Sequence, residues 1–435
     1  MTALIAILNR DAVALAADSA VTSTSDLGDK IFTSSNKLFA LSKYHPIGIM
    51  IYGNASFMGI PWETIIKMYS EQLGKTAFKR LNQYANHFIK FLNSYDHIVK
   101  ESIQKEAFSE NLHIYLEMIK DVIKKQVDIK YEKTGRISNW DLQRITAKVI
   151  DQHYQLWREA PYAHGIPDTF TKSILSLYGD IIKKAIDSIF APLSVSQRSI
   201  DKLRRIASYI EIKFPAEMED TDITGIIVAG FGEDEIFPCL KAFEVKNIIN
   251  NRVIYNDLVS VKIGYDKLGA VMPFAQREMV STFMEGIDPK FFNTIKDCLI
   301  EVFSEYPNKI IKSLALTKSV INNKYRQKIE KDAKSLYGGF ISLLNEYSYK
   351  VHISQVTRVV AILPKNELAE MAESLVNLTC FKRRVTMDSE TVAGPIDVAT
   401  ISKGDGFIWI KRKQYFEEDL NRHFIINQCK EYYNE

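Results

Sequence analysis

The chain opens with two short apolar segments joined by a polar turn. Residues 3–8 are uniformly apolar, Asn9-Arg10-Asp11 is polar, and residues 12–17 are apolar again. Two apolar runs of this length around a short polar turn predict a β-hairpin whose strands are both well buried. Asp18-Ser19 follows at once, so a carboxylate is expected at the end of the second strand.

Further strand-like segments follow the hairpin. Lys30-Ile31-Phe32 and Lys37-Leu38-Phe39-Ala40-Leu41 are short and apolar, and each begins with a lysine. Residues 46–55 contain a continuous apolar run that ends at Gly53, which predicts a buried strand leading into a turn. Strands are also expected over 223–230 and 239–245. A last hairpin is expected over 396–411, with a Gly-Asp-Gly corner.

Helical periodicity dominates the rest of the chain. Residues 62–73, 77–92 and 112–127 have apolar residues at helical spacing, and helices are expected to continue to about residue 210. A second helical stretch is predicted over 289–349, followed by a strand around 359–362 and a core-facing helix over 368–378. The pattern therefore divides the chain into a β-rich core (1–60, 214–288 and 350–435) and two helical insertions, 61–213 and 289–349.

Composition narrows the class of protein. The 435 residues are 46% hydrophobic, and 56 basic residues nearly balance 53 acidic ones. This balance gives no broad basic footprint, so no nucleic-acid partner is expected. Apolar runs are shorter than a membrane span and no secretory leader is apparent, so we expect a cytoplasmic protein without a membrane partner. Scattered cysteines and histidines without ligand spacing predict no metal and no cofactor.

Thr2 is the most informative candidate for chemistry. Its small side chain favours removal of Met1, which would leave a hydroxyl nucleophile and a free α-amine on one residue. An α-amine has a pKa of about 7.7–8, so it can serve as a base near neutral pH.

The order of these features resembles that of the proteasome β-subunits and their bacterial proteasome-like relatives, which are N-terminal-nucleophile (Ntn) hydrolases. The matching features are Thr2, Ala16-Ala17-Asp18-Ser19, a lysine at the head of a strand, and Gly53-Asn54-Ala55. Lys30 and Lys37 both compete for the lysine position, and the strand layout that follows favours Lys37. The resemblance implies an α+β fold: a four-layer α-β-β-α Ntn-hydrolase sandwich carrying two long helical insertions.

The resemblance also implies roles for particular residues. Lys37 would favour the ionised hydroxyl of Thr2, Asp18 would hold Lys37, and the Gly53 N–H would donate to the developing oxyanion. Asp388 and Thr391 would hydrogen-bond around the amine of the nucleophile. The alternative is structural: an exposed ion pair for Asp18 and Lys37, a plain turn at Gly53, and capping of a loop by Asp388 and Thr391.

One element of the family pattern is missing. A central Gly-Ser-Gly segment, whose serine reaches the terminal amine in the family, has no counterpart in residues 263–276. Gln276 is the nearest polar candidate for that contact.

Together these features predict a threonine-type amide hydrolase, a proteasome-like peptidase acting on a peptide or protein substrate. Association with further copies of the chain is left open. Two alternatives stand beside this prediction: an Ntn amidase for a small-molecule amide, and a non-catalytic proteasome-like scaffold or sensor.

Overall fold

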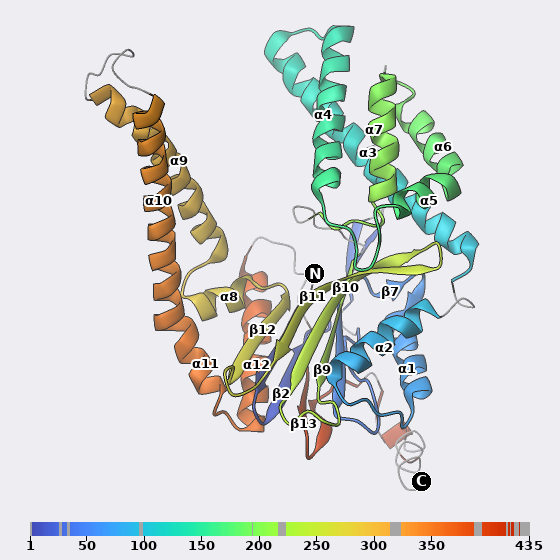
Figure 1. Ribbon diagram of the computed structural model, residues 1–435. Coiled ribbons are helices and arrows are strands. Elements are labelled where there is room, and N and C mark those ends of the chain that lie inside the picture. Colours follow the sequence, from blue (N-terminus) through green and yellow to red (C-terminus); the bar gives the residue numbers. More distant parts are fainter. Residues whose placement is uncertain are drawn as a thin grey trace.

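The computed structural model describes residues 2–25, 28–32, 35–94, 99–193, 195–215, 223–313, 323–386, 394–414, 416–417, 419–421 and 426. The protein is a mixed α/β structure built around two five-stranded antiparallel sheets, with helices on their outer faces and two groups of helices that extend from one end of them (Figure 1). The mixed α/β class and the antiparallel pairing agree with the sequence prediction.

The first sheet holds the N-terminal hairpin. Its strands lie in the order β12-β1-β2-β13-β14. Their bounds are β12 Gly269–Ala275, β1 Ala3–Asn9, β2 Ala12–Ala17, β13 Asp397–Ser402 and β14 Gly406–Lys411. The predicted hairpin is confirmed: β1 pairs with β2 from Leu4 opposite Ala17 to Leu8 opposite Val13. The predicted C-terminal hairpin is confirmed as β13–β14.

The second sheet has the order β11-β10-β9-β6-β5. Its strands are β11 Arg252–Lys262, β10 Cys239–Ile249, β9 Thr224–Gly230, β6 Ile47–Gly53 and β5 Leu38–Ala40. Two small ribbons, β3 Val21–Ser25 with β4 Gly28–Phe32 and β7 Ser56–Phe57 with β8 Ile60–Pro61, complete the strands. The predicted strands at 30–32, 37–41, 46–55, 223–230 and 239–245 are therefore present.

The two sheets share a hydrophobic core. Leu4, Leu8 and Leu15 of the first sheet pack in one cluster with Met50 and Ile227 of the second. Because alternate strand residues point to opposite faces, the intervening side chains of β1 and β2 form a separate cluster on the outer side of the first sheet. That outer cluster contains Ile5, Ile7 and the small residues Ala12, Ala14 and Ala16, a flat surface for a helix.

Helices cover the outer faces of both sheets. Helix α12 (Lys365–Val385) packs on the outer face of the first sheet through residues such as Leu368 and Ala372. Helices α1 (Trp62–Leu73) and α2 (Leu81–Asn93) share a core with β6, β9 and β10 of the second sheet. The helices predicted at 62–73 and 77–92 are thus confirmed, and they lie against the second sheet.

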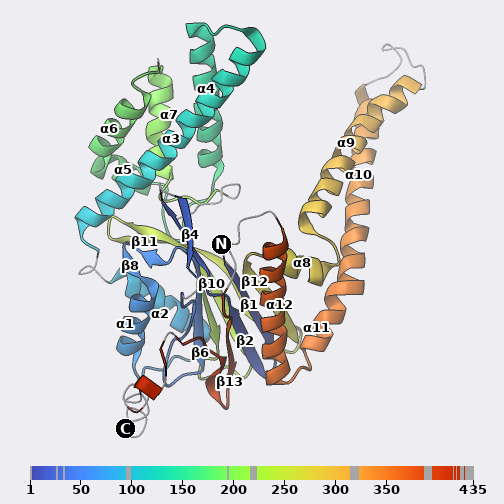
Figure 2. The same ribbon diagram turned by 180° about the vertical axis from the view of Figure 1, so that it is seen from behind.

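The remaining helices before β9 form a bundle with a core of their own, which extends to Ile249 and Ile254 of the second sheet. They are α3 Glu101–Thr134, α4 Asn139–Glu159, α5 Phe170–Leu177, α6 Gly179–Phe190 and α7 Gln197–Tyr209. The helical pattern predicted from 112 to about 210 is confirmed. The bundle extends from the same end of the sheets as the N-terminus (Figures 1 and 2).

A second projection is a pair of long helices, α9 (Pro289–Ser313) and α10 (Asn323–Ser348), preceded by the short α8 (Glu278–Glu285). A π-helical turn, η1 (Tyr349–Ile353), leads into α11 (Ser354–Val360), and a short 3-10 turn, η2 (Asp419–Asn421), lies near the C-terminus. Helices α9 and α10 lie side by side and extend away from the sheets (Figure 2).

One predicted element is wrong. The strand expected around residues 359–362 is the end of α11 and the turn after it. Val356, Val360 and Leu363 contact the outer cluster of the first sheet at helical spacing. A run of four apolar residues fits either period, and packing against β1 selects the helix.

Candidate functional site

Thr2 lies at the start of β1, the strand between β2 and β12 in the first sheet. Its side chain is only 5% exposed. The backbone N–H of Gln276 donates to the Thr2 carbonyl oxygen over 3.1 Å, and Ala3 pairs with Ala275 just beyond. The backbone of the candidate nucleophile is therefore held by its neighbours on both sides.

The Lys37 ammonium contacts the Thr2 hydroxyl. Lys37 Nζ donates to Thr2 Oγ1 over 2.9 Å, and the lysine is almost fully buried. Lys37 comes directly before β5, the edge strand of the second sheet, and its carbonyl accepts a hydrogen bond from Ile51 N. The side chain therefore reaches from one sheet to a residue that belongs to the other.

Asp18 holds in place both the Lys37 ammonium and the backbone next to Thr2. Its Oδ1 accepts a hydrogen bond from Lys37 Nζ over 2.8 Å and another from the Ala3 backbone N–H over 3.0 Å. The second carboxylate oxygen, Oδ2, accepts from the Ala20 N–H, and Lys37 Nζ also donates to the Ala20 carbonyl. Asp18 is fully buried, so both of its oxygens are satisfied inside the protein.

Burial shapes the ionisation of this pair. Burial lowers the pKa of the Lys37 ammonium below its ordinary value, and the nearby Asp18 carboxylate opposes that shift. Burial likewise raises the pKa of Asp18, against the attraction of Lys37 and the hydrogen bonds from Ala3 and Ala20. The geometry thus places a cationic donor on a hydroxyl, an arrangement that lowers the cost of forming the alkoxide.

Gly53 lies beside the candidate nucleophile at the end of β6. Its φ is +89°, in the region that favours glycine, and a Cβ there would lie 2.1 Å from the Ile223 carbonyl oxygen. The neighbouring backbone therefore excludes a side chain at this position. The Gly53 backbone is open to the cavity described next.

A cavity of about 250 Å³ opens at Thr2. Its walls include Lys37, Gly53 and Tyr52, together with Asn36 and Glu63. Asn36 donates to Glu63 over 3.2 Å, and Lys67 pairs with the same carboxyl, which lowers the pKa of Glu63 against the effect of burial. The pocket therefore carries an ionised carboxylate in its wall at neutral pH.

The structure brings together four of the six residues that the sequence singles out: Thr2, Asp18, Lys37 and Gly53. Asp388 and Thr391 lie outside the described residues, as does the side chain of Lys30. Gln276 is adjacent to Thr2, but it contacts Thr2 through its backbone N–H, and its side-chain oxygen accepts a hydrogen bond from Arg383. Its expected contact with the amine stays a prediction.

Sequence reasoning missed several members of the site. The Ala20 carbonyl, the second acceptor for Lys37, carries no side-chain signal at all. Tyr52 lines the cavity, and burial together with the nearby Glu244 raises its pKa to about 12. Tyr52 immediately precedes Gly53 and Asn36 immediately precedes Lys37, so both could have been found from adjacency, whereas Glu63 comes from a separate segment.

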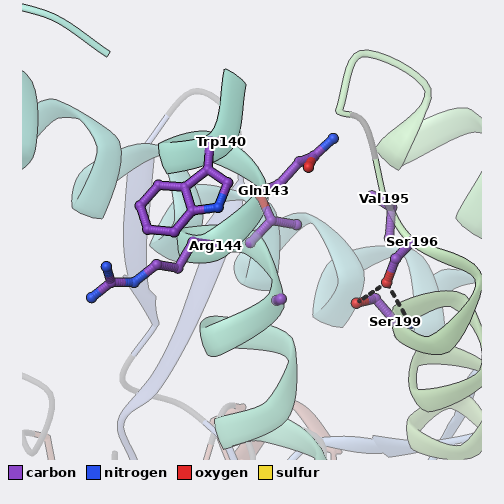
Figure 3. Close-up of a pocket in the computed structure, with 8 residues that line it drawn as sticks. Trp140, Gln143, Arg144, Val195, Ser196 and Ser199 are labelled. Atoms are coloured by element: carbon purple, nitrogen blue, oxygen red, sulfur yellow. Dashed lines mark hydrogen bonds between the residues drawn. The ribbon is translucent and has the colours of Figure 1, made fainter. Parts of the chain in front are cut away.

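A larger cavity, of about 440 Å³, lies in the helical bundle between α4 and the start of α7 (Figure 3). Trp140 and Arg144 of α4 stack there, with the guanidinium carbon 5.3 Å from the ring centre. Ser196 and Ser199 share a hydrogen bond at the start of α7. Ser196 is the N-cap of α7 and accepts a hydrogen bond from the Ser199 N–H, so among the described residues these hydroxyls serve a helix cap, whereas Thr2 contacts a lysine.

Two further features bear on the function: metal ligands and membrane-spanning helices. Within the described ranges, no group of three or more His, Cys, Asp or Glu side chains could hold a metal ion. None of the helices in the described part of the chain combines the length and apolar character needed to cross a bilayer.

Comparison with known proteins finds weak structural similarity and no matching family model. No family model matches the chain, and no curated protein matches it. Among solved structures, a Gly-1 mutant of Anbu from Hyphomicrobium sp. strain MC1 is similar, at 9% identity over 100% of this chain and 97% of that one, with a TM-score of 0.26. Anbu (ancestral beta-subunit) from Yersinia bercovieri is similar at 8% identity over the same shares, with a TM-score of 0.24.

These findings correct one expectation from the sequence. The assignment to the bacterial proteasome-like branch of the proteasome β-subunit-like Ntn hydrolases is wrong as a family assignment, because no family model matches and the structural scores are far too low. Similarity at these TM-scores carries no argument about family or function. Whatever is inferred about activity must therefore come from the residues around Thr2.

Proposed function

We propose that the chain is an amide hydrolase of the threonine type, in which the Thr2 hydroxyl is the nucleophile once the residue before it is removed. The observation that carries the proposal is the contact of Lys37 Nζ with Thr2 Oγ1 at 2.9 Å, inside a buried pair with Asp18. A charged lysine without a counter-ion would destabilise the folded state at this buried position, because burying a lone charge is costly.

In the proposed reaction Thr2 Oγ attacks the carbonyl carbon of the substrate amide. The freed α-amine of Thr2, directly or through a water molecule, takes the hydroxyl proton and returns a proton to the leaving nitrogen. The C–N bond then breaks and an ester with Thr2 remains, which water hydrolyses. Lys37 stabilises the alkoxide, Asp18 fixes Lys37, and the N–H of Gly53 donates to the oxyanion, a contribution of about 3–4 kcal/mol for one such donor.

The proposal includes the substrate and the fold. A peptide or protein is the substrate that we favour, because the cavity at Thr2 is partly open and is lined by both polar and apolar groups. We further propose that the two sheets, with α12 on one side and α1 and α2 on the other, form a four-layer α-β-β-α sandwich of the Ntn-hydrolase type. The ranges 61–213 and 289–349 are the proposed helical insertions, and the first of them begins with α1 and α2, the helices that cover the second sheet. We also propose that Asp388 and Thr391 support the amine and that the protein is cytoplasmic.

The size of the cavity favours a second candidate. At about 250 Å³ the space at Thr2 is smaller than the 300–1,000 Å³ that drug-sized ligands usually occupy. A small-molecule amide would fit it whole, whereas a peptide would place one side chain there. Turnover of a peptide library compared with a library of small amides separates the two candidates.

The first experiment measures the intact mass of the purified protein before and after reaction with a peptide epoxyketone, a probe that needs a terminal hydroxyl and its amine together. We expect a mass without Met1 and a single adduct that maps to Thr2. Retention of Met1, or an unreactive Thr2, would contradict the mechanism and favour a non-catalytic scaffold or sensor.

The matching variant is Thr2→Ala, which removes the nucleophile and leaves the strand. We expect turnover to fall to background while the far-UV circular dichroism is unchanged, and we expect Thr2→Ser to retain a measurable fraction. Thr134→Ala, at an exposed hydroxyl on α3 remote from the cavity, serves as the control. Full activity in the Thr2→Ala variant would contradict the proposal.

A further inference from the structure

Among the described residues of the hairpin formed by α9 and α10, few side chains are buried. The two helices meet through an inner row of side chains in which Phe303 and Tyr337 face each other, with ring centres 6.3 Å apart. Ala333 is buried in the same row. Helices of about 25 residues, roughly 38 Å long, are marginal when isolated in water and normally need a packed apolar face.

A second apolar row on α10 is open to solvent. Leu336, Phe340, Leu343 and Tyr347 are between 43% and 65% exposed. Their spacing of four, three and four residues places them on one face of the helix. On α9, Val302 and Tyr306 are similarly exposed, in a row that continues back through the free Cys298 to Phe291.

The two exposed rows lie on the same side of the hairpin. Val302 and Tyr306 follow the inner residues Leu299 and Phe303 by three positions, and Leu336 and Phe340 follow Ala333 and Tyr337 by three positions. Three residues turn a helix by about 300°, so each outer row lies roughly 60° to one side of the inner row. Because α9 and α10 run in opposite directions, the two rotations bring both rows to one face, which we call the outer face.

Two glycines in α10 add an independent observation. Gly338 and Gly339 interrupt the middle of a 26-residue helix, where each glycine costs about 1 kcal/mol relative to alanine. A Cβ at either position would meet no atom within 4 Å, so the packing of this chain does not require them. Gly339 is three residues after Leu336 and four before Leu343, so it borders the exposed row, where a glycine lets another helix approach closely.

We infer that the outer face pairs with the outer face of a second copy of this chain, forming a two-fold symmetric four-helix bundle. The spacing of the α10 row is the same when read in either direction. A second α10 running antiparallel therefore places Leu336 opposite Tyr347 and Phe340 opposite Leu343 of its partner. This self-complementarity is what a two-fold interface requires.

The apolar area is consistent with a dimer of this kind. Seven large side chains of the outer face, each about half exposed out of roughly 200 Å², offer about 700–800 Å² per copy. A stable interface of ordinary size buries about 800 Å² on each partner. Patches of this size on a monomer generally mark an interaction site.

The inference is tested by sedimentation equilibrium of the full chain at micromolar concentration. The wild type should self-associate, and Leu343→Lys should weaken association about thirtyfold or more, as for a central interface residue. Ile300→Lys, an exposed apolar position on the opposite face of α9, should leave association unchanged. A monomeric wild type, or a Leu343→Lys variant that associates like the wild type, would overturn the inference.

A complementary pair of variants excludes misfolding as the cause. Leu336→Lys and Tyr347→Glu should each self-associate poorly, and a mixture of the two should form the heterodimer, because the lysine of one copy then meets the glutamate of the other. Gly339→Gln should also weaken association without lowering the melting temperature, since it adds a better helix former in open space. Failure of the mixture to pair would reject this register and the two-fold arrangement.

Discussion

At the scale of single residues, the site is defined by one buried ion pair in which burial shifts each pKa against the attraction between the two charges. Lys37 and Asp18 lie 2.8 Å apart and are both almost fully buried. The paired arrangement limits the cost of burial, but the stability of such a pair depends on pH because the folded and unfolded pKa values differ.

The sign of this dependence follows from the direction of each shift. The lowered pKa of Lys37 means that the folded state binds fewer protons than the unfolded state up to about pH 10.4, so stability rises with pH in the alkaline range. The raised pKa of Asp18 means that the folded state binds more protons above about pH 3.9, so stability falls as pH rises in the acidic range.

We therefore expect urea midpoints of the wild type, measured relative to an Asp18→Asn/Lys37→Met double variant, to fall with pH in acid and to rise in alkali. The double variant removes both titrating groups and keeps the approximate volumes. A difference that stays flat from pH 4 to pH 10 would show that neither pKa is shifted by folding.

The cysteines offer a second prediction at this scale. Burial raises the pKa of the Cys380 thiol to about 11, and burial together with Glu235 raises that of Cys239 to about 12. Cys298 is exposed on α9. In a Cys429→Ser/Leu343→Lys background, in which the outer face should be uncovered, iodoacetamide at pH 8 should modify Cys298 first, because only a thiolate that is present and accessible reacts. Peptide mapping over time checks the order, and early labelling of Cys380 would contradict it.

At the scale of elements, the backbone conformation and packing at the end of β6 favour glycine at position 53. Gly53→Ala would place a Cβ 2.1 Å from the Ile223 carbonyl oxygen at a φ of +89°. We expect a loss of about 2–4 kcal/mol in the free energy of unfolding. Gly59→Ala is the matched control, because Gly59 has a φ of +82° and open space around it, so that it costs only the backbone strain of about 1–2 kcal/mol. Equal losses in both variants would rule out the clash.

The elements also show how far the sequence predicts this fold. The β1–β2 hairpin follows from uniform apolar runs, and the helices α1, α2 and α3 follow from their period. The error at residues 359–362 arises because a four-residue apolar run has no period of its own. Its state depends on packing between Val360 and strand β1, more than 350 residues away in the chain.

The site was predicted less directly than the fold. No local pattern relates Lys37 to Thr2, because their contact joins the residue just before an edge strand of one sheet to the residue just before a strand of the other. The order of motifs identified both residues, and the structure supplies the distance. The Ala20 carbonyl and the wall formed by Asn36 and Glu63 depend on backbone geometry, which side-chain chemistry alone does not encode.

At the scale of the whole molecule, the helical bundle α3–α7 and the hairpin α9–α10 extend from the end of the sheets at which the N-terminus lies (Figures 1 and 2). The hairpin contacts the rest of the described molecule at its base, through α8 and η1, so its outer face is free along most of its length. Association through that face would leave the cavity at Thr2 outside the interface, and activity should then survive the variants that separate the copies.

The attachment of Thr2 and Lys37 to different sheets has one more consequence. A partly folded chain in which each sheet has formed, but the two have not yet docked, would hold the hydroxyl and the ammonium far apart. Such a chain would have no hydrolytic activity, so the proposed hydrolase would become active only when its two sheets dock at the last step of folding. The protein would in this way be protected during synthesis from a prematurely active nucleophile.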